Sequence, residues 1–225
     1  MKRISWLQIG AVLSALFIFY AKPAWPQSSS RQAMTWFESG LRESGPQQKI
    51  AAYSQAVALD PSFVEAWFNL GMVHQEQKDY ARAEEYFRKA YEVKPEKLET
   101  ALKLKIVYAL AEVYNKSGKL ESYEKALHQA KALASSPEML ARLSFELGRL
   151  MYQRQRYDQA LTELQEGRHY VTKDREHYEN LIVLAEKALR LEKAYVQAER
   201  EKAGGNLKEA RARFEQIHAE SPKFR

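Results

Sequence analysis

The stretch that decides the fold is residues 67–95, WFNLGMVHQEQKDYARAEEYFRKAYEVKP. Four residues at spacing i, i+3, i+4 and i+7 share one face of a first helix: Trp67, Leu70, Gly71 and His74. Lys78 and Asp79 make a turn, and a second helix follows whose facing stripe consists of Ala83, Phe87 and Ala90. Pro95 ends that second helix. The stretch therefore predicts a helical hairpin in which Gly71 admits the second helix closely and Ala83 faces it.

This hairpin resembles the tetratricopeptide repeat (TPR), whose signature it meets at seven positions, with His74 in place of the usual tyrosine. The best repeat spans residues 64–97. Weaker copies of the same pattern are expected at about 33–63, 104–137, 141–174 and 191–225. The resemblance implies an all-α fold, a TPR-type helical-hairpin solenoid over residues 33–225, in which each hairpin covers an apolar face of its neighbour.

The spacing between the copies is irregular and exceeds the usual period of the family. The extra length falls at residues 96–102 and 134–137, where either a helix is prolonged or a loop grows. Residues 174–203 contain no Gly or Pro and carry apolar side chains at helical spacing. They predict one long penultimate helix, whose C-terminal half pairs with a C-terminal capping helix at 207–219.

The N-terminal residues 1–27 have the pattern of an export segment. Lys2 and Arg3 precede residues 4–21, which carry no charge, and two prolines then break any helix. The apolar run is slightly long for the core of a signal peptide and slightly short for a membrane span, so a cleaved signal peptide and a retained N-terminal membrane anchor both stay open. A spacer follows at 28–32. Either alternative exports the body to the cell envelope, as a soluble periplasmic protein or anchored in the inner membrane.

The composition argues against several classes of function. The chain has no cysteine, which excludes a disulfide framework, a thiolate metal site and a cysteine nucleophile. Its net charge of +6 owes much to Lys2, Arg3 and Lys22, and the remaining charges are interspersed, so we expect no nucleic-acid partner. The sequence contains no G-x-S-x-G, H-E-x-x-H, P-loop or dinucleotide-binding motif. We therefore predict no catalytic residue, no metal, no cofactor and no enzymatic activity.

In TPR proteins the first helices of the hairpins line a groove that holds partner segments, and the resemblance implies such a groove here. Ten residues lie opposite the packing stripe and are expected to line it: Phe68, Asn69, Met72, Lys105, Tyr108, Glu112, Arg142, Phe145, Arg149 and Tyr152. Phe68, Tyr108 and Phe145 occupy equivalent positions and form an aromatic ladder. Aromatic and arginine side chains dominate binding hot spots. The alternative is that these aromatic rings pack between hairpins.

The function that the resemblance implies is a non-catalytic scaffold that binds a protein or peptide segment, in an envelope assembly, secretion or cell-wall complex. The alternative is an accessory subunit that positions an envelope enzyme or a polysaccharide. Arg142 and Arg149 favour a partner segment with acidic residues beside an apolar anchor. The membrane is a further partner if residues 4–21 are retained. The oligomeric state is not predicted.

Overall fold

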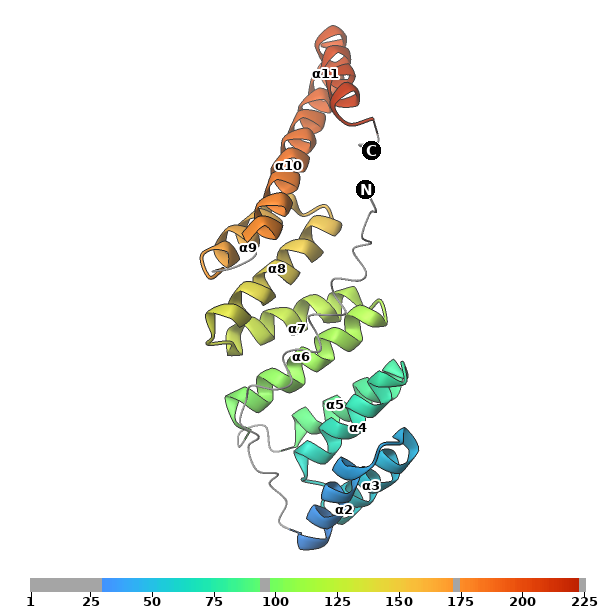
Figure 1. The fold of residues 1–225 in the computed structure, drawn as a ribbon. Helices are drawn as coiled ribbons and strands as arrows, with labels where there is room; N and C mark the ends of the chain where they lie inside the picture. The colour runs from blue at the N-terminus through green and yellow to red at the C-terminus, as the bar shows by residue number, and fades with distance from the viewer. Residues whose placement is uncertain (1–29, 94–97, 172–174, 223–225) are drawn as a thin grey trace, which may run out of the picture. The chain divides into compact units, whose positions relative to one another are not determined.

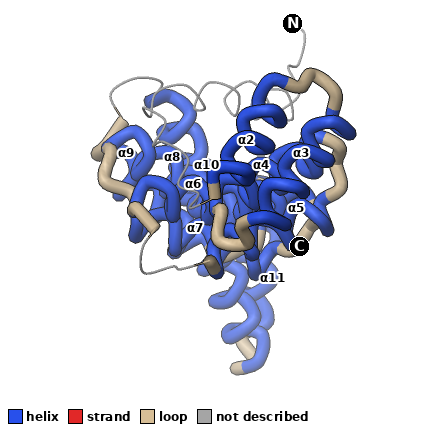
Figure 2. The backbone as a smooth tube through the Cα atoms, turned by 90° about the horizontal axis from the view of Figure 1, so that it is seen from below, coloured by secondary structure: helices blue, strands red, loops and turns tan. Residues whose placement is uncertain are grey.

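The computed structural model describes residues 30–93, 98–171 and 175–222, so the predicted export segment, 1–27, lies outside the described residues. In these ranges the chain forms ten α-helices and no strand, which confirms the all-α class (Figure 1, Figure 2). The helices are α2 (Arg31–Arg42), α3 (Pro46–Leu59), α4 (Val64–Glu76), α5 (Tyr80–Glu92), α6 (Thr100–Lys116), α7 (Leu120–Leu133), α8 (Pro137–Gln153), α9 (Tyr157–Arg168), α10 (Arg175–Ala203) and α11 (Leu207–Glu220). Among these helices, none combines the length and apolarity that a membrane crossing requires.

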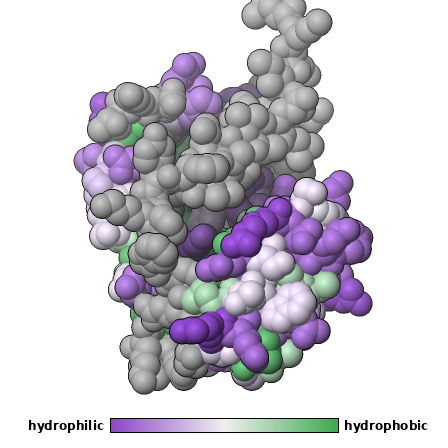
Figure 3. Space-filling view, turned by 60° about the horizontal axis from the view of Figure 1, so that its bottom comes forward, coloured by the Kyte–Doolittle hydropathy of each residue, from purple (hydrophilic) through white to green (hydrophobic). Residues whose placement is uncertain are grey.

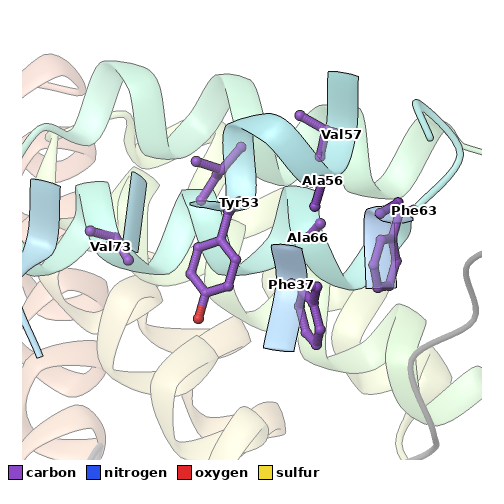
Figure 4. Packing of buried hydrophobic residues seen from close by; sticks show 9 residues of the cluster. Phe37, Tyr53, Ala56, Val57, Phe63, Ala66 and Val73 are labelled. Atoms are coloured by element: carbon purple, nitrogen blue, oxygen red, sulfur yellow. The ribbon is translucent and has the colours of Figure 1, made fainter. Parts of the chain in front are cut away.

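The chain divides into two compact units, residues 1–96 and 97–225. The described part of the first unit contains two hairpins, α2–α3 and α4–α5, which pack on each other through α3 and α4. Its core combines nine buried residues from α2, α3, α4 and the α3–α4 turn: Ala33, Phe37, Tyr53, Ala56, Val57, Phe63, Ala66, Leu70 and Val73 (Figure 4). The rings of Phe37 and Phe63 meet with centroids 4.8 Å apart. Removal of this apolar surface from water is the main force that joins the two hairpins.

The close approach of α4 and α5 depends on Gly71. A Cβ atom at Gly71 would lie 2.5 Å from the ring of Phe87, which is the nearest side chain and was not predicted from the sequence. The phenylalanine ring reaches the surface that glycine leaves bare. The same arrangement recurs in α2–α3, where Tyr53 covers Gly40. Ala83, which was predicted to face Gly71, is fully buried.

Four hairpins share one type of turn. The residue at each turn has a positive φ: Lys78 (63°), Gly118 (73°), Gln155 (59°) and Gly205 (84°). The next residue donates its backbone N–H to the carbonyl five positions earlier, as Asp79 does to His74 and Lys119 does to Tyr114, both at 2.9 Å. Glycine adopts this left-handed conformation without cost, whereas Lys78 and Gln155 do so against their intrinsic preference.

The second unit contains the hairpins α6–α7 and α8–α9, followed by α10 and α11. Gly148 admits Leu164 as Gly71 admits Phe87, since a Cβ atom at Gly148 would lie 2.5 Å from the Leu164 side chain. The helices α6 and α8 each have 17 residues, whereas α4 has 13. Before α8 the connection has only three residues, 134–136, so the extra length there prolongs the helix. Before α6 the helix is longer and the connection, residues 93–99, is longer as well.

The long penultimate helix is confirmed as α10, with 29 residues. Its N-terminal half packs against α9, where Tyr178 and Ile182 are buried. Its C-terminal half pairs with α11 through an edge-on contact of Tyr195 and Phe214, at 5.4 Å, as predicted for a capping helix. The carboxylate of Glu201 accepts hydrogen bonds from the guanidinium of Arg213 across the same pair.

In the second unit, ion pairs join α7 and α9, the second helices of two successive hairpins. The Lys131 ammonium on α7 contacts Glu163 at 2.7 Å and Glu166 at 2.8 Å on α9. Burial alone would lower the pKa of Lys131, but the hydrogen bonds to these two carboxylates outweigh burial and raise it. These pairs fix the stacking of the α6–α7 hairpin on the α8–α9 hairpin.

Candidate functional site

The three predicted groove residues of the first unit lie on α4, and one of them is unavailable to a ligand. Phe68 is 6% exposed, and its ring packs against that of Phe87 at 5.3 Å. It therefore belongs to the hairpin interface. Asn69 and Met72 are half-buried on the same helix. Burial raises the pKa of the Tyr53 hydroxyl, and a hydrogen bond with the Asn69 side chain partly offsets this rise, so Asn69 also serves the contact of α3 with α4.

The predicted groove residues of the second unit begin with Tyr108 on α6. Its half-buried ring lies beneath the guanidinium of Arg142 on α8, whose carbon is 4.9 Å from the ring centroid. This cation–π contact ties the first helices of two successive hairpins together. Burial raises the pKa of Tyr108, and the positive charge of Arg142 partly offsets this rise. Lys105 is exposed one turn before Tyr108, and Glu112 is half-buried one turn after it.

A second polar contact joins α7 to α8. Two of its residues, Tyr123 and Glu146, were not predicted from the sequence. The buried Tyr123 of α7 donates its hydroxyl hydrogen to a Glu146 carboxylate oxygen at 2.8 Å. The same oxygen accepts a hydrogen bond from Arg149 at 2.6 Å. Burial alone would lower the pKa of Arg149, but the Glu146 carboxylate outweighs burial and raises it. Arg149 is thus held in a fixed orientation at the surface, with a third of its side chain exposed.

The remaining aromatic residues of α8 contact the neighbouring helices. Phe145 is half-buried, and its ring lies 5.1 Å from that of Tyr178 on α10. Tyr152 is half-buried beside Tyr157, which opens α9, at 5.5 Å. Hence Phe145 packs between hairpins and keeps only part of its ring accessible. The predicted aromatic ladder is not a row of free rings, because each ring that we describe has an aromatic or cationic neighbour within its own unit.

What the second unit offers on α6 and α8 is a mixed surface of half-exposed aromatic and charged groups. We call it the α6–α8 surface, and define it by Lys105, Tyr108, Glu112, Arg142, Phe145, Glu146, Arg149 and Tyr152. It has three basic and two acidic side chains. Such a surface can hold a peptide by stacking, hydrogen bonds and ion pairs. In the described ranges, no group of three His, Asp or Glu side chains is placed to hold a metal.

Two hollows that were not predicted from the sequence lie on α10. One is lined by Leu161 of α9 with Leu189, Arg190 and Lys193 of α10. It forms where α10 runs on past the start of α9. The other lies between α10 and α11, beside Leu191 and Ile217. Both hollows follow from the length of α10, which the absence of Gly and Pro predicted. Which residues line them depends on how α10 is aligned against α9 and α11, and no sequence motif indicates that alignment.

Comparisons with known proteins agree with this architecture. The family model for the tetratricopeptide repeat matches residues 64–97. Among solved structures, the chain is similar to a crystal structure of MamA protein, with a TM-score of 0.59 and 19% identity, over 84% of this chain and 95% of that one. A MamA structure from Desulfovibrio magneticus RS-1 gives a TM-score of 0.54 and 13% identity, over 85% and 96% of the two chains. No curated protein sequence matches the chain. At these identities the structural matches establish the fold.

Proposed function

We propose that this chain, which carries a tetratricopeptide repeat within a TPR-type fold, is a non-catalytic scaffold that binds a segment of a partner protein on its α6–α8 surface. The TPR fold is a protein-interaction scaffold, and stacked hairpins of this kind present extended surfaces to partners. The site residues follow from the chemistry of α6 and α8. The pathway that we propose is an assembly, secretion or cell-wall complex of the cell envelope, because of the apolar N-terminal segment.

The position of Tyr108 is the reason for choosing this surface. Tyr108 remains half-exposed beneath Arg142, with the exposed Lys105 one helical turn away. A tyrosine ring and basic groups that are already fixed by intramolecular contacts lose little entropy when a ligand binds. The basic groups near the ring, Arg142 and Lys105, favour an acidic side chain in the partner, beside an apolar group that packs on Phe145.

The test is capture of partners from crosslinked membranes by the full chain, followed by affinity measurements with the captured protein. We expect Tyr108→Ala to weaken binding by roughly 1 kcal/mol or more, and Arg149→Glu to weaken it further by charge repulsion. Lys125→Glu, on the exposed face of α7, is the matched control and should bind as the wild type does. Unfolding by Tyr108→Ala, with unchanged binding per folded molecule, would instead assign Tyr108 to packing alone.

The location in the envelope has a separate test. Lys2 and Arg3 favour a cytoplasmic N-terminus, which directs the body outward whether or not residues 4–21 are cleaved. A reporter that is active only outside the cytoplasm should therefore work when it is fused after Arg225. Activity of a cytoplasm-only reporter at that position would contradict export. Sequencing of the mature N-terminus distinguishes a cleaved signal peptide from an anchor.

A further inference from the structure

Trp36 and Trp67 occupy equivalent positions in the two hairpins of the first unit, but only Trp67 is covered. Trp36 lies four residues before Gly40, and Trp67 lies four residues before Gly71. Each glycine is covered by a ring from the second helix of its hairpin. The Trp67 ring stacks on Tyr86 at 5.8 Å and lies 4.8 Å below the Lys89 ammonium. Its indole N–H donates to the carbonyl of Pro61 at 2.9 Å. Trp67 is thus a structural residue of its hairpin.

Trp36 lacks this cover because α3 has different residues at the corresponding places. In α5, Tyr86 directly precedes Phe87, whose ring covers Gly71. In α3, the corresponding residue is Ala52, which directly precedes Tyr53, whose ring covers Gly40. The residue that corresponds to Lys89 is Gln55. The Trp36 ring consequently has no aromatic or cationic partner among the described residues, and it is 44% exposed.

Trp36 is one of the large apolar side chains that remain exposed. In the lower part of Figure 3, green and pale side chains lie among purple ones, as is usual for a surface in water. Leu41, which is 56% exposed, lies five residues after Trp36 on α2, so the two side chains do not share one face of the helix. Tryptophan, with an apolar ring and a polar N–H, is enriched both at protein interfaces and at the lipid–water boundary.

The sequence before α2 indicates what covers Trp36. Nine residues, 22–30, separate the uncharged run 4–21 from Arg31, the first residue of α2. A fully extended chain spans at most about 3.6 Å per residue, so a run held in a bilayer keeps the start of α2 within roughly 35 Å of the membrane. These nine residues, 22–30, include Lys22 and no acidic side chain, which suits an anionic lipid surface.

We propose that Trp36 docks into the headgroup layer of the membrane and holds the first unit against the lipid surface. This inference rests on the retained form of the N-terminal segment in the proposed location. Tryptophan is favoured at the membrane–water interface, where its ring is in the acyl boundary and its N–H remains hydrated. The contact orients α2 along the membrane surface, close to the point at which the chain leaves the bilayer.

The experiment uses the full chain on vesicles of equal parts phosphatidylcholine and phosphatidylglycerol, with and without brominated phosphatidylcholine, which quenches nearby tryptophan. The chain has four tryptophans. One variant keeps only Trp36, through Trp6→Phe, Trp25→Phe and Trp67→Phe. The matched control keeps only Trp67, through Trp6→Phe, Trp25→Phe and Trp36→Phe. Circular dichroism confirms that both variants keep the helical fold.

We expect both variants to float with the vesicles, and brominated lipid to reduce Trp36 fluorescence by roughly twofold or more, as for a ring at the interface, while Trp67 is unchanged. Flotation with equal and weak quenching of the two tryptophans would overturn the docking of Trp36 while leaving the anchor in place. Failure of both variants to float would contradict the anchor and, with it, the docking. Neither result bears on partner binding at the α6–α8 surface.

Discussion

The hairpins α4–α5 and α10–α11 have the same arrangement of residues, but their aromatic rings are buried to different extents. In each, a small residue precedes a large aromatic residue by sixteen positions, as Gly71 precedes Phe87 and Ala198 precedes Phe214. Phe87 is fully buried against the bare surface of Gly71. Phe214 is only half-buried, although Ala198, at the position equivalent to Gly71, is fully covered. The hairpin that has alanine in place of glycine on its first helix therefore has the more exposed aromatic ring.

This difference shows why one repeat is easy to recognise and another is not. The α4–α5 hairpin requires glycine and a ring at fixed positions, so its sequence is constrained and matches the family signature. The α10–α11 hairpin has a stripe of alanine and leucine beside a surface of charged residues, and its helix continues far beyond the usual length. Close packing constrains a sequence more strongly than helix formation does.

The largest effect should come from Phe87→Ala. It removes a fully buried ring from the closest contact of the α4–α5 hairpin. We expect the free energy of unfolding to fall by about 3–5 kcal/mol, whereas Phe214→Ala should lower it by about 1 kcal/mol because that ring is partly hydrated already. Urea unfolding followed by circular dichroism measures both. Similar losses would mean that the two hairpins are equally close-packed.

Ala83→Leu should have the next largest effect. Ala83 is fully buried, so three additional carbon atoms force α4 and α5 apart, and we expect a loss of about 2–3 kcal/mol. The matched control is Glu85→Leu, because Glu85 is exposed on the same helix. Its change should remain within about 0.5 kcal/mol. Equal thermal shifts of the two variants would place Ala83 on the outer face, against its burial.

Gly71→Ala should have a smaller effect, because two terms oppose each other. The added Cβ atom would meet the Phe87 ring at 2.5 Å, which costs about 1–3 kcal/mol, while alanine favours a helix by about 1 kcal/mol. We expect a net loss of about 1 kcal/mol in urea unfolding. Gly204→Ala is the control, since its nearest neighbour is 3.4 Å away. A Gly71→Ala protein as stable as the wild type would show that Phe87 moves aside freely.

The smallest effect concerns the shared turns. Gln155 has a φ of 59°, whereas Gly118 and Gly205 occupy the same place in their hairpins. Gln155→Gly should therefore stabilise the second unit by up to about 1 kcal/mol, because it relieves the left-handed strain. Gly118→Gln should destabilise it by a similar amount. A loss of stability in both variants would show that the side chain of Gln155 contributes a contact that outweighs the strain.

The sequence predicted the hairpins, the long penultimate helix and the capping helix, because apolar spacing and the absence of breakers are local signals. It did not predict that Phe87 covers Gly71, since the reach of a side chain depends on the distance between helix axes. The groove was predicted less well than the fold. The positions on α6 and α8 follow from helical periodicity, but their partners Tyr123 and Tyr178 come from other helices, whose register no local pattern determines.

We propose above that a partner segment lies on the α6–α8 surface. Site-specific photocrosslinking tests this proposal most directly, with benzoylphenylalanine in place of either Lys105 or Lys125. Both lysines are exposed and belong to the α6–α7 hairpin, but Lys105 lies beside Tyr108 and Lys125 lies on the second helix. We predict that irradiation in intact cells crosslinks a partner protein at position 105 and none at position 125. Crosslinks at 125 alone, or equally at both positions, would contradict the claim.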